Sequence, residues 1–196
     1  MTIGLIAVCV AVFAYELLVQ STEGDGGLER LFLDYGLIPA SLTAGLGDLP
    51  GGLASALIPV FASMFLHGGW IHLIGNMLYL WIFGNNVEDR LGRLGFLLFY
   101  LGGGVVAAVS QVVVGPDSEV PVIGASGAIA AVLGAYVVLY PRARVLTLVF
   151  LGFFYQLLQV PAVIILGFWF VLQLVSGVAS LGAAKMTGDV ALFAHI

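Results

Sequence analysis

A serine between small residues is the strongest candidate nucleophile in this chain of 196 residues. Ser126 lies in the run Gly-Ala-Ser-Gly at 124–127, near the start of a helix predicted over residues 123–140. Flanking glycines let another backbone or a substrate approach the hydroxyl closely, and the N–H groups of a helix start can stabilise an oxyanion. Small residues in apolar helices also serve close packing. The motif alone therefore favours packing over catalysis.

A histidine and an asparagine could assist this serine from another helix. His72 and Asn76 are four residues apart, so they lie on one face of the helix predicted over residues 61–83. Both side chains can donate hydrogen bonds, either to a neighbouring helix or to a developing negative charge, and polar pairs in lipid are costly unless paired or functional. His67, followed by two glycines, is expected nearer the membrane surface, where it would contact the preceding loop.

A general base for the serine could come from His195. A neutral imidazole that accepts the Ser126 proton would activate the hydroxyl as a nucleophile. Asp189 comes six residues before His195 and faces away from it on a helix, which indicates a dyad rather than a triad. Residues 67–72 read His-Gly-Gly-Trp-Ile-His, without the glutamate of a zinc-protease helix. We therefore expect no metal and no other cofactor.

The composition indicates that lipid surrounds most of the chain. Hydrophobic residues make up 61%, charged residues only 9%, and the mean hydropathy is +1.14, whereas soluble domains carry about 25% charged residues. The six Lys and Arg residues form no stripe along which a phosphate backbone could lie, so we exclude nucleic acid as a partner. The predicted fold class is an all-α polytopic membrane protein with the bilayer as its partner.

Apolar segments divide the chain into one membrane domain over residues 1–196. A long external loop is expected over residues 21–59, and residues 145–159 are too short to span, which indicates an interfacial or re-entrant segment. Residues 182–188 are expected to form a loop of small residues. The predicted helices cover residues 2–20, 61–83, 94–114, 123–140 and 161–181, with a sixth beginning near 189.

Charge predicts the orientation of these helices. Four of the six basic residues fall in the segments 85–93 and 141–144, which must lie on the same side of the membrane. The positive-inside rule places that side in the cytoplasm. The second, fourth and sixth helices then enter from the outer face, and their polar residues share the outer leaflet.

The combined motifs resemble the rhomboid family of intramembrane serine proteases, in its bacterial form. The matching runs are His-Gly-Gly-Trp-Ile-His-Leu-Ile-Gly-Asn at 67–76, Gly-Asn-Asn-Val-Glu-Asp-Arg-Leu-Gly at 84–92, Gly-Ala-Ser-Gly at 124–127, Ala-His at 194–195 and Tyr-Gly-Leu-Ile-Pro-Ala at 35–40. Each run is modest alone, but their order and spacing together are specific. The resemblance implies a six-helix bundle around a cavity that opens outward.

The resemblance also implies roles for individual residues. Ser126 would be the nucleophile and His195 the general base, and the oxyanion hole would combine the side chains of His72 and Asn76 with the Ser126 N–H. Phe168 and Trp169 would belong to a lateral substrate gate, and the small-residue loop 182–188 would act as a cap. The implied activity is cleavage of single-pass transmembrane proteins. The implied location is the bacterial inner membrane, with the active site facing outward.

Two departures from the family pattern affect these expectations. Ala130 stands where many members carry an aromatic that stacks on the catalytic histidine, and the glycine-rich continuation after Ile196 is absent. We therefore expect a truncated sixth helix. The alternative interpretation is a rhomboid-like pseudoprotease, or an inactive fragment, that binds membrane clients without cleavage. A small transporter is disfavoured, because Glu16 is expected near a helix end and no other carboxylate lies in the predicted spans.

Overall fold

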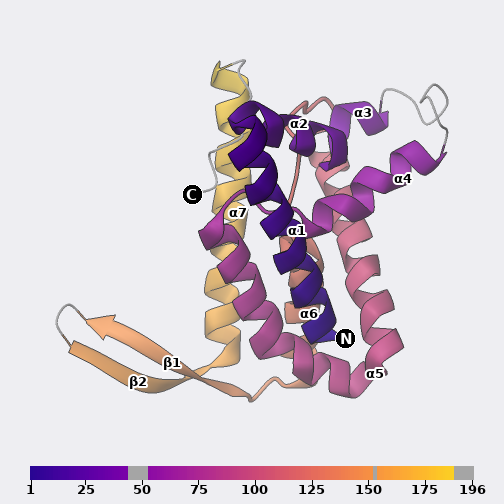
Figure 1. Cartoon of the computed structure of the whole chain (residues 1–196). Helices are drawn as coiled ribbons and strands as arrows, with labels where there is room; N and C mark the ends of the chain where they lie inside the picture. Colours follow the sequence, from indigo (N-terminus) through magenta and orange to yellow (C-terminus); the bar gives the residue numbers. More distant parts are fainter. Residues whose placement is uncertain (44–52, 152–153, 188–196) are drawn as a thin grey trace.

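The computed structural model describes residues 1–43, 53–151 and 154–187, and this part of the chain is mostly helical (Figure 1). Its elements follow in order: α1 Thr2–Glu23, α2 Asp25–Tyr35, α3 Pro39–Thr43, α4 Leu53–Ala62, the 3-10 turn η1 Ser63–Phe65, α5 Trp70–Val114, α6 Ser126–Leu139, β1 Arg144–Leu151, β2 Phe154–Pro161 and α7 Ala162–Thr187. The sixth helix predicted from residue 189 lies outside the described residues.

Two described helices, α1 and α5, are long and apolar enough to cross a membrane. α5 has 45 residues, about twice what one crossing requires. Its backbone leaves the helical region at Gly92, where φ is 72° and ψ is 165°, a conformation that glycine adopts without steric cost. Figure 1 shows the chain turning back at this kink, so α5 contains the second half of the predicted helix 61–83 and the whole of the predicted helix 94–114.

The start of the second predicted helix is wrong. Helix α4 and the turn η1 end at Phe65, residues 66–69 are not helical, and α5 begins at Trp70. Consecutive Gly68 and Gly69 disfavour a continuous helix. His72 therefore lies in the first turn of α5 rather than halfway along a helix.

The predicted external loop 21–59 is also partly wrong, because α2, α3 and the first part of α4 are helical. Leu28 and Phe32 of α2 are four residues apart and both buried, and they pack with Leu66. Leu37 pairs with Val122 in an isolated antiparallel bridge. These contacts place the segment after α1 beside the segment that leads into α6.

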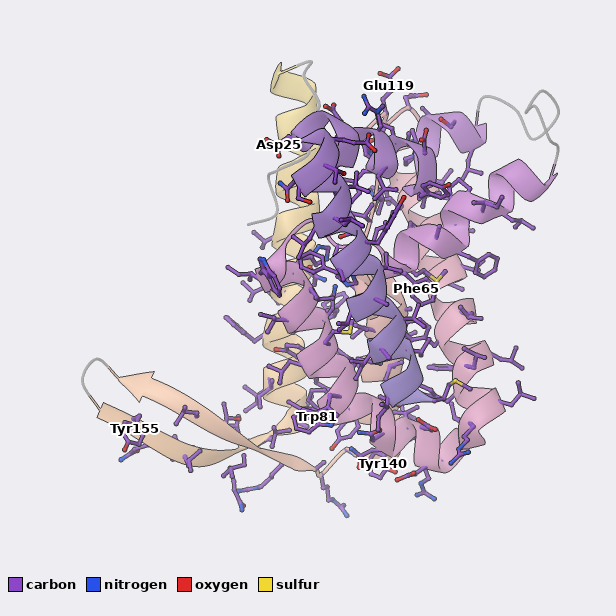
Figure 2. All side chains as sticks on the ribbon, viewed as in Figure 1. Asp25, Phe65, Trp81, Glu119, Tyr140 and Tyr155 are labelled. Carbon is purple, nitrogen blue, oxygen red and sulfur yellow. The ribbon has the colours of Figure 1, made fainter. Side chains whose placement is uncertain are left out.

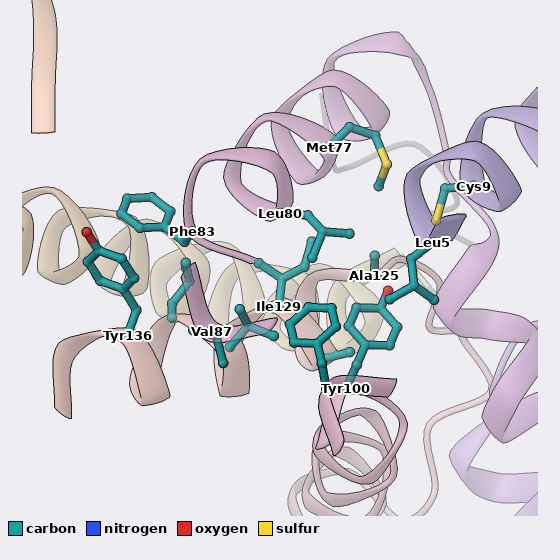
Figure 3. Packing of buried hydrophobic residues seen from close by; sticks show 14 of the residues in the cluster. Leu5, Cys9, Met77, Leu80, Phe83, Val87, Tyr100, Ala125, Ile129 and Tyr136 are labelled. Carbon is teal, nitrogen blue, oxygen red and sulfur yellow. The ribbon is translucent and has the colours of Figure 1, made fainter. Parts of the chain in front are cut away.

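One main core joins α1, both halves of α5 and α6 (Figure 3). Tyr100, Phe96 and Leu80 are fully buried in it. α6 begins at Ser126, three residues later than predicted. Close packing between α5 and α6 depends on small residues, since a methyl group on Gly103 would collide with Ala131.

The segments that carry the arginines lie at one end of the bundle, as the charge pattern predicts. The Arg90 guanidinium lies 5.8 Å from the centre of the Tyr140 ring, and the Tyr140 hydroxyl donates a hydrogen bond to the Asn86 carbonyl oxygen (3.0 Å). Figure 2 shows Tyr140 and Trp81 at this end and Asp25 and Glu119 at the other.

An antiparallel hairpin of β1 and β2 replaces the predicted interfacial or re-entrant segment, with Arg144 opposite Pro161 in its register. The all-α prediction is therefore wrong at residues 144–161. The hairpin projects from the arginine-rich end of the bundle (Figure 1), and Leu146, Tyr155 and Leu157 are exposed. In β1 the β-branched Val145, Thr147 and Val149 alternate with other apolar residues, a pattern typical of strands. Beyond it, α7 extends the predicted fifth helix to Thr187, so the predicted loop 182–188 is helical over its described part.

Candidate active site

Ser126 and His72 occupy the first turns of two neighbouring helices. Ser126 is the first residue of α6, and His72 is the third of α5. The first N–H groups of a helix have no partner within the helix, so the Ser126 and Gly127 N–H groups are oriented out of α6. Ser126 is half-buried. Two polar side chains and a helix start therefore meet at one level of the bundle.

Gly124 brings His72 close to the serine. Its φ is 122°, and a Cβ atom built there would lie 2.6 Å from His72 Nε2 and 3.7 Å from Ser126 Oγ. The imidazole therefore lies directly over the Gly124 backbone, beside the serine hydroxyl. The Gly124 N–H donates to the Ser63 carbonyl oxygen (2.8 Å), which fastens the segment before Ser126 to η1.

The hydrogen bonding of His72 assigns its tautomer. The Gly68 N–H donates to His72 Nδ1 (3.4 Å), so Nδ1 acts as an acceptor. In a neutral imidazole the other nitrogen then carries the hydrogen. His72 Nε2 is therefore a donor, and it is the ring nitrogen that faces Gly124, two residues before Ser126.

Asn76 lies one turn further along α5 and is 5% exposed. Its amide nitrogen has no hydrogen-bond partner within the described part of the chain. An unpaired buried donor costs about 1–3 kcal/mol, and such groups in native structures call for a specific reason, such as a catalytic role. Asn76 can therefore supply a hydrogen bond to a group that enters the site.

His67 is deeply buried, and its hydrogen-bond partner is α1 rather than the preceding loop that the sequence predicted. It is 1% exposed, and its N–H donates to Glu16 Oε1 of α1 (3.0 Å). Its Nδ1 donates to the Phe65 carbonyl oxygen (3.1 Å), and its ring meets the His72 ring edge-on with centroids 5.1 Å apart. The partner of His67 is thus the apolar helix α1.

Glu16 is the residue that sequence reasoning missed. It is 2% exposed and lies two turns before the end of α1, whereas the sequence suggested a position near a helix end. The signal was present, because an ionisable residue in an apolar helix is rare and points to a partner in the bundle interior. Glu16 joins α1 to the turn that precedes His72.

A hollow of about 150 Å³ lies beside Ser126. Most of its lining is apolar, from η1, the second half of α5 and the start of α6. Its polar side chains are Ser63, Gln111 and Ser126. A small side chain or ordered water would fit next to the serine hydroxyl.

The proposed gate residues lie on α7. Phe168 is 64% exposed, and the Trp169 ring packs 5.6 Å from the Tyr79 ring of α5. Tyr79 follows Asn76 by one turn, so Trp169 of α7 contacts α5 one turn beyond Asn76. His195 lies outside the described residues, and its predicted pairing with Ser126 stays a prediction.

Sequence comparisons identify relatives of this chain. The Rhomboid domain family model matches residues 54–196. The chain is 39% identical over 89 residues to "Presenilin-associated rhomboid-like protein A, mitochondrial" of Danio rerio, which covers 44% of this chain and 23% of the relative. It is 33% identical over 102 residues to "Rhomboid protein 1, mitochondrial" of Saccharomyces cerevisiae, covering 47% of this chain and 28% of the relative.

A bacterial relative is "Putative rhomboid protease YdcA" of Bacillus subtilis, 38% identical over 73 residues, or 37% of this chain and 36% of the relative. The matches thus span about a quarter to a third of these relatives' own lengths. Members of the matching family are membrane proteins, in agreement with the apolar helices α1 and α5. Since the family model covers more than half of the sequence, the chain belongs to the rhomboid family.

Proposed function

We propose that this protein is an intramembrane serine endopeptidase that cleaves single-pass transmembrane proteins, with Ser126 as nucleophile and His195 as general base. The observation that carries the proposal is the position of His72 Nε2 over Gly124 beside Ser126. A packing role for the Gly-Ala-Ser-Gly run would not require a hydrogen-bond donor there. The rhomboid membership of the chain supports the same reaction class.

The proposed reaction is acyl transfer to the serine followed by hydrolysis. Ser126 Oγ attacks the peptide carbonyl carbon while its proton passes to His195. The resulting oxyanion receives hydrogen bonds from His72 Nε2, Asn76 Nδ2 and the Ser126 N–H. His195 then gives its proton to the leaving amine. Water, deprotonated by the same imidazole, releases the acyl group and restores the serine.

Two features of the described chain support a small residue before the cleaved bond and entry from the bilayer. The hollow beside Ser126, about 150 Å³, is mostly apolar and has room for a small side chain. Exposed Phe168 and the contact of Trp169 with Tyr79 are consistent with α7 as a lateral gate. The proposed location is the bacterial inner membrane, with the arginine-rich end in the cytoplasm.

The test uses the protein in lipid vesicles with a single-pass model substrate. Ser126→Ala should reduce cleavage by at least about a thousandfold, the scale on which loss of a serine nucleophile acts. Ser110→Ala is the matched control, because Ser110 is exposed on α5 and bonds only to the Val106 carbonyl oxygen. Cleavage that survives Ser126→Ala would disprove the proposal.

A serine-reactive fluorophosphonate tests the nucleophile separately. We expect labelling that Ser126→Ala removes, measured for this chain and for a version extended past Ile196. Labelling of the extended version alone would show that His195 needs the residues after Ile196 to activate Ser126. Binding of the substrate without labelling or cleavage in either version would favour the pseudoprotease alternative.

A further inference from the structure

We propose that Glu16 is a positioning residue for the oxyanion side of the active site, acting through the His67–Gly68 turn on His72. The inference rests on the proposed peptidase function and extends it to α1, a helix that supplies no group to the reaction itself. It begins from the one carboxyl group buried beside the site.

The contacts form a continuous chain from α1 to the serine. Glu16 Oε1 accepts the His67 N–H (3.0 Å), and the next N–H along the backbone, that of Gly68, donates to His72 Nδ1 (3.4 Å). His72 Nε2 then lies over Gly124 beside Ser126. Glu16 therefore orients one peptide group, and the adjacent peptide group sets the tautomer of His72.

The turn depends on this support because helical hydrogen bonds do not hold it. Residues 66–69 lie between η1 and α5 and have no helical structure, and Gly68 and Gly69 allow many backbone conformations. The His67 side chain adds one tether, from Nδ1 to the Phe65 carbonyl oxygen. Glu16 supplies another, from α1 to the His67 N–H.

A purely stabilising role explains Glu16 less well. Its second oxygen, Oε2, and His67 Nε2 are buried without hydrogen-bond partners in the described residues. A carboxyl group that is buried and only half satisfied is costly, and apolar replacements of buried charged groups are often as stable or more stable. Such a group beside an active site is explained if it lowers stability but contributes to activity.

Glu88 provides a matched comparison at the other end of the same helix pair. It accepts hydrogen bonds from the Thr2 N–H and the Thr2 hydroxyl, both 2.7 Å, and contacts the Met1 amine. It thus joins α1 to α5 as Glu16 does, but on the helical turn next to Gly92. Glu88→Leu removes a tether of α1 without touching the site.

The experiment compares Glu16→Leu, Glu16→Gln and Glu88→Leu in lipid vesicles with a single-pass substrate. Glu16→Leu should lower kcat by about 10–100-fold, the range for a misplaced catalytic group, while KM stays within about twofold. Glu16→Gln keeps an acceptor oxygen at the same reach and should keep kcat within about threefold. Glu88→Leu should lower the unfolding temperature and leave kcat of the folded protein within about twofold.

A second readout is independent of activity. Nitrogen-15 spectra of histidine-labelled protein report which ring nitrogen of His72 carries the hydrogen. We expect the Nε2–H form in the unaltered protein and in Glu16→Gln, and a mixture of tautomers in Glu16→Leu. Glu16→Asp retains the carboxyl group but withdraws the oxygen by one methylene, so the same mixture should appear there.

Unchanged His72 tautomers in Glu16→Leu and Glu16→Asp would overturn the inference, and so would equal losses of kcat in Glu16→Leu and Glu88→Leu. A Glu16→Leu protein that does not fold leaves Glu16→Asp and Glu16→Gln to decide by the same spectra. Ser126→Ala separates the two proposals. Cleavage that survives Ser126→Ala rejects the peptidase, whereas the spectra still test the role of Glu16.

Discussion

Each end of α1 is joined to the α5 region by hydrogen bonds to a carboxyl group, but the two contacts have different roles. At one end Glu16 meets the turn before α5, near Gly124; at the other, Glu88 meets Thr2, near Gly92. Both ends thus combine a carboxylate with a glycine at positive φ. Within the described residues, both oxygens of Glu88 accept hydrogen bonds, whereas buried polar atoms without a hydrogen-bond partner gather at the Glu16 end.

The comparison shows at which end of the bundle buried polar groups without hydrogen-bond partners reduce the stability of the fold. Within the described residues, the buried side-chain atoms without hydrogen-bond partners belong to Glu16, His67, Asn76 and Tyr100. The first three surround the turn before α5 and its first two turns. Unsatisfied buried groups are rare in native proteins. Their concentration at one end of the bundle agrees with the proposed position of the active site.

The largest expected effect comes from Gly124, which like Gly92 has a positive φ. At Gly124 a methyl group would lie 2.6 Å from His72 Nε2, whereas at Gly92 it would meet nothing within 4 Å. We therefore expect Gly124→Ala to lower kcat/KM by about 100-fold or more, since it displaces an oxyanion donor. Substrate cleavage in vesicles measures this loss.

Both substitutions place a side chain on a residue with positive φ, so Gly92→Ala is the control for the backbone strain that this causes. Its positive φ should lower the free energy of unfolding by about 1–3 kcal/mol without altering kcat/KM of the folded protein. Equal losses of kcat/KM in the two variants would show that backbone strain, and not the contact with His72, limits the reaction.

Asn76→Leu should separate activity from stability. Removing a donor to the proposed oxyanion should lower kcat by about 100-fold. The Asn76 amide nitrogen has no hydrogen-bond partner among the described residues, so an apolar replacement should leave the unfolding free energy unchanged or raise it by about 1 kcal/mol. Kinetics and chemical denaturation in detergent measure the two effects. Asn85→Leu, further along α5, is the control, because the Asn85 amide already donates to the Trp81 carbonyl oxygen (3.0 Å). A clear loss of stability in Asn76→Leu would contradict the comparison.

Sequence patterns predicted that the polar residues of the second and fourth helices share one leaflet, because the number of spans between two loops determines whether they lie on the same side. The four arginines placed segments 85–93 and 141–144 together, and the contact of Arg90 with Tyr140 confirms it. The kink at Gly92 was not needed for that conclusion. This conclusion depends on the number of membrane spans between the two segments and not on where each helix begins and ends.

Local structure in the loops was harder to predict. Helix α2 carries only a short apolar stripe, Leu28 and Phe32, and it is stabilised by packing on Leu66, far away in sequence. The apolar hairpin of β1 and β2 has a composition that also suits a helix, and its pairing depends on its register. The Glu16–His67 bond joins residues 51 apart, and no local pattern encodes such a contact.

The smallest expected effect belongs to the arginine-rich end. Tyr140→Phe removes the hydrogen bond from the Tyr140 hydroxyl to the Asn86 carbonyl oxygen but keeps the ring beneath Arg90. Because Tyr140 is only half-buried, the unfolding free energy should fall by about 0.5–1 kcal/mol. Arg90→Gln removes the guanidinium that lies over the Tyr140 ring, and it should lower the unfolding free energy by about 0.5 kcal/mol. Neither variant should alter kcat or the His72 tautomer; a change in either would mean that this end is coupled to the active site through α5, and the contrast between the two ends would fail.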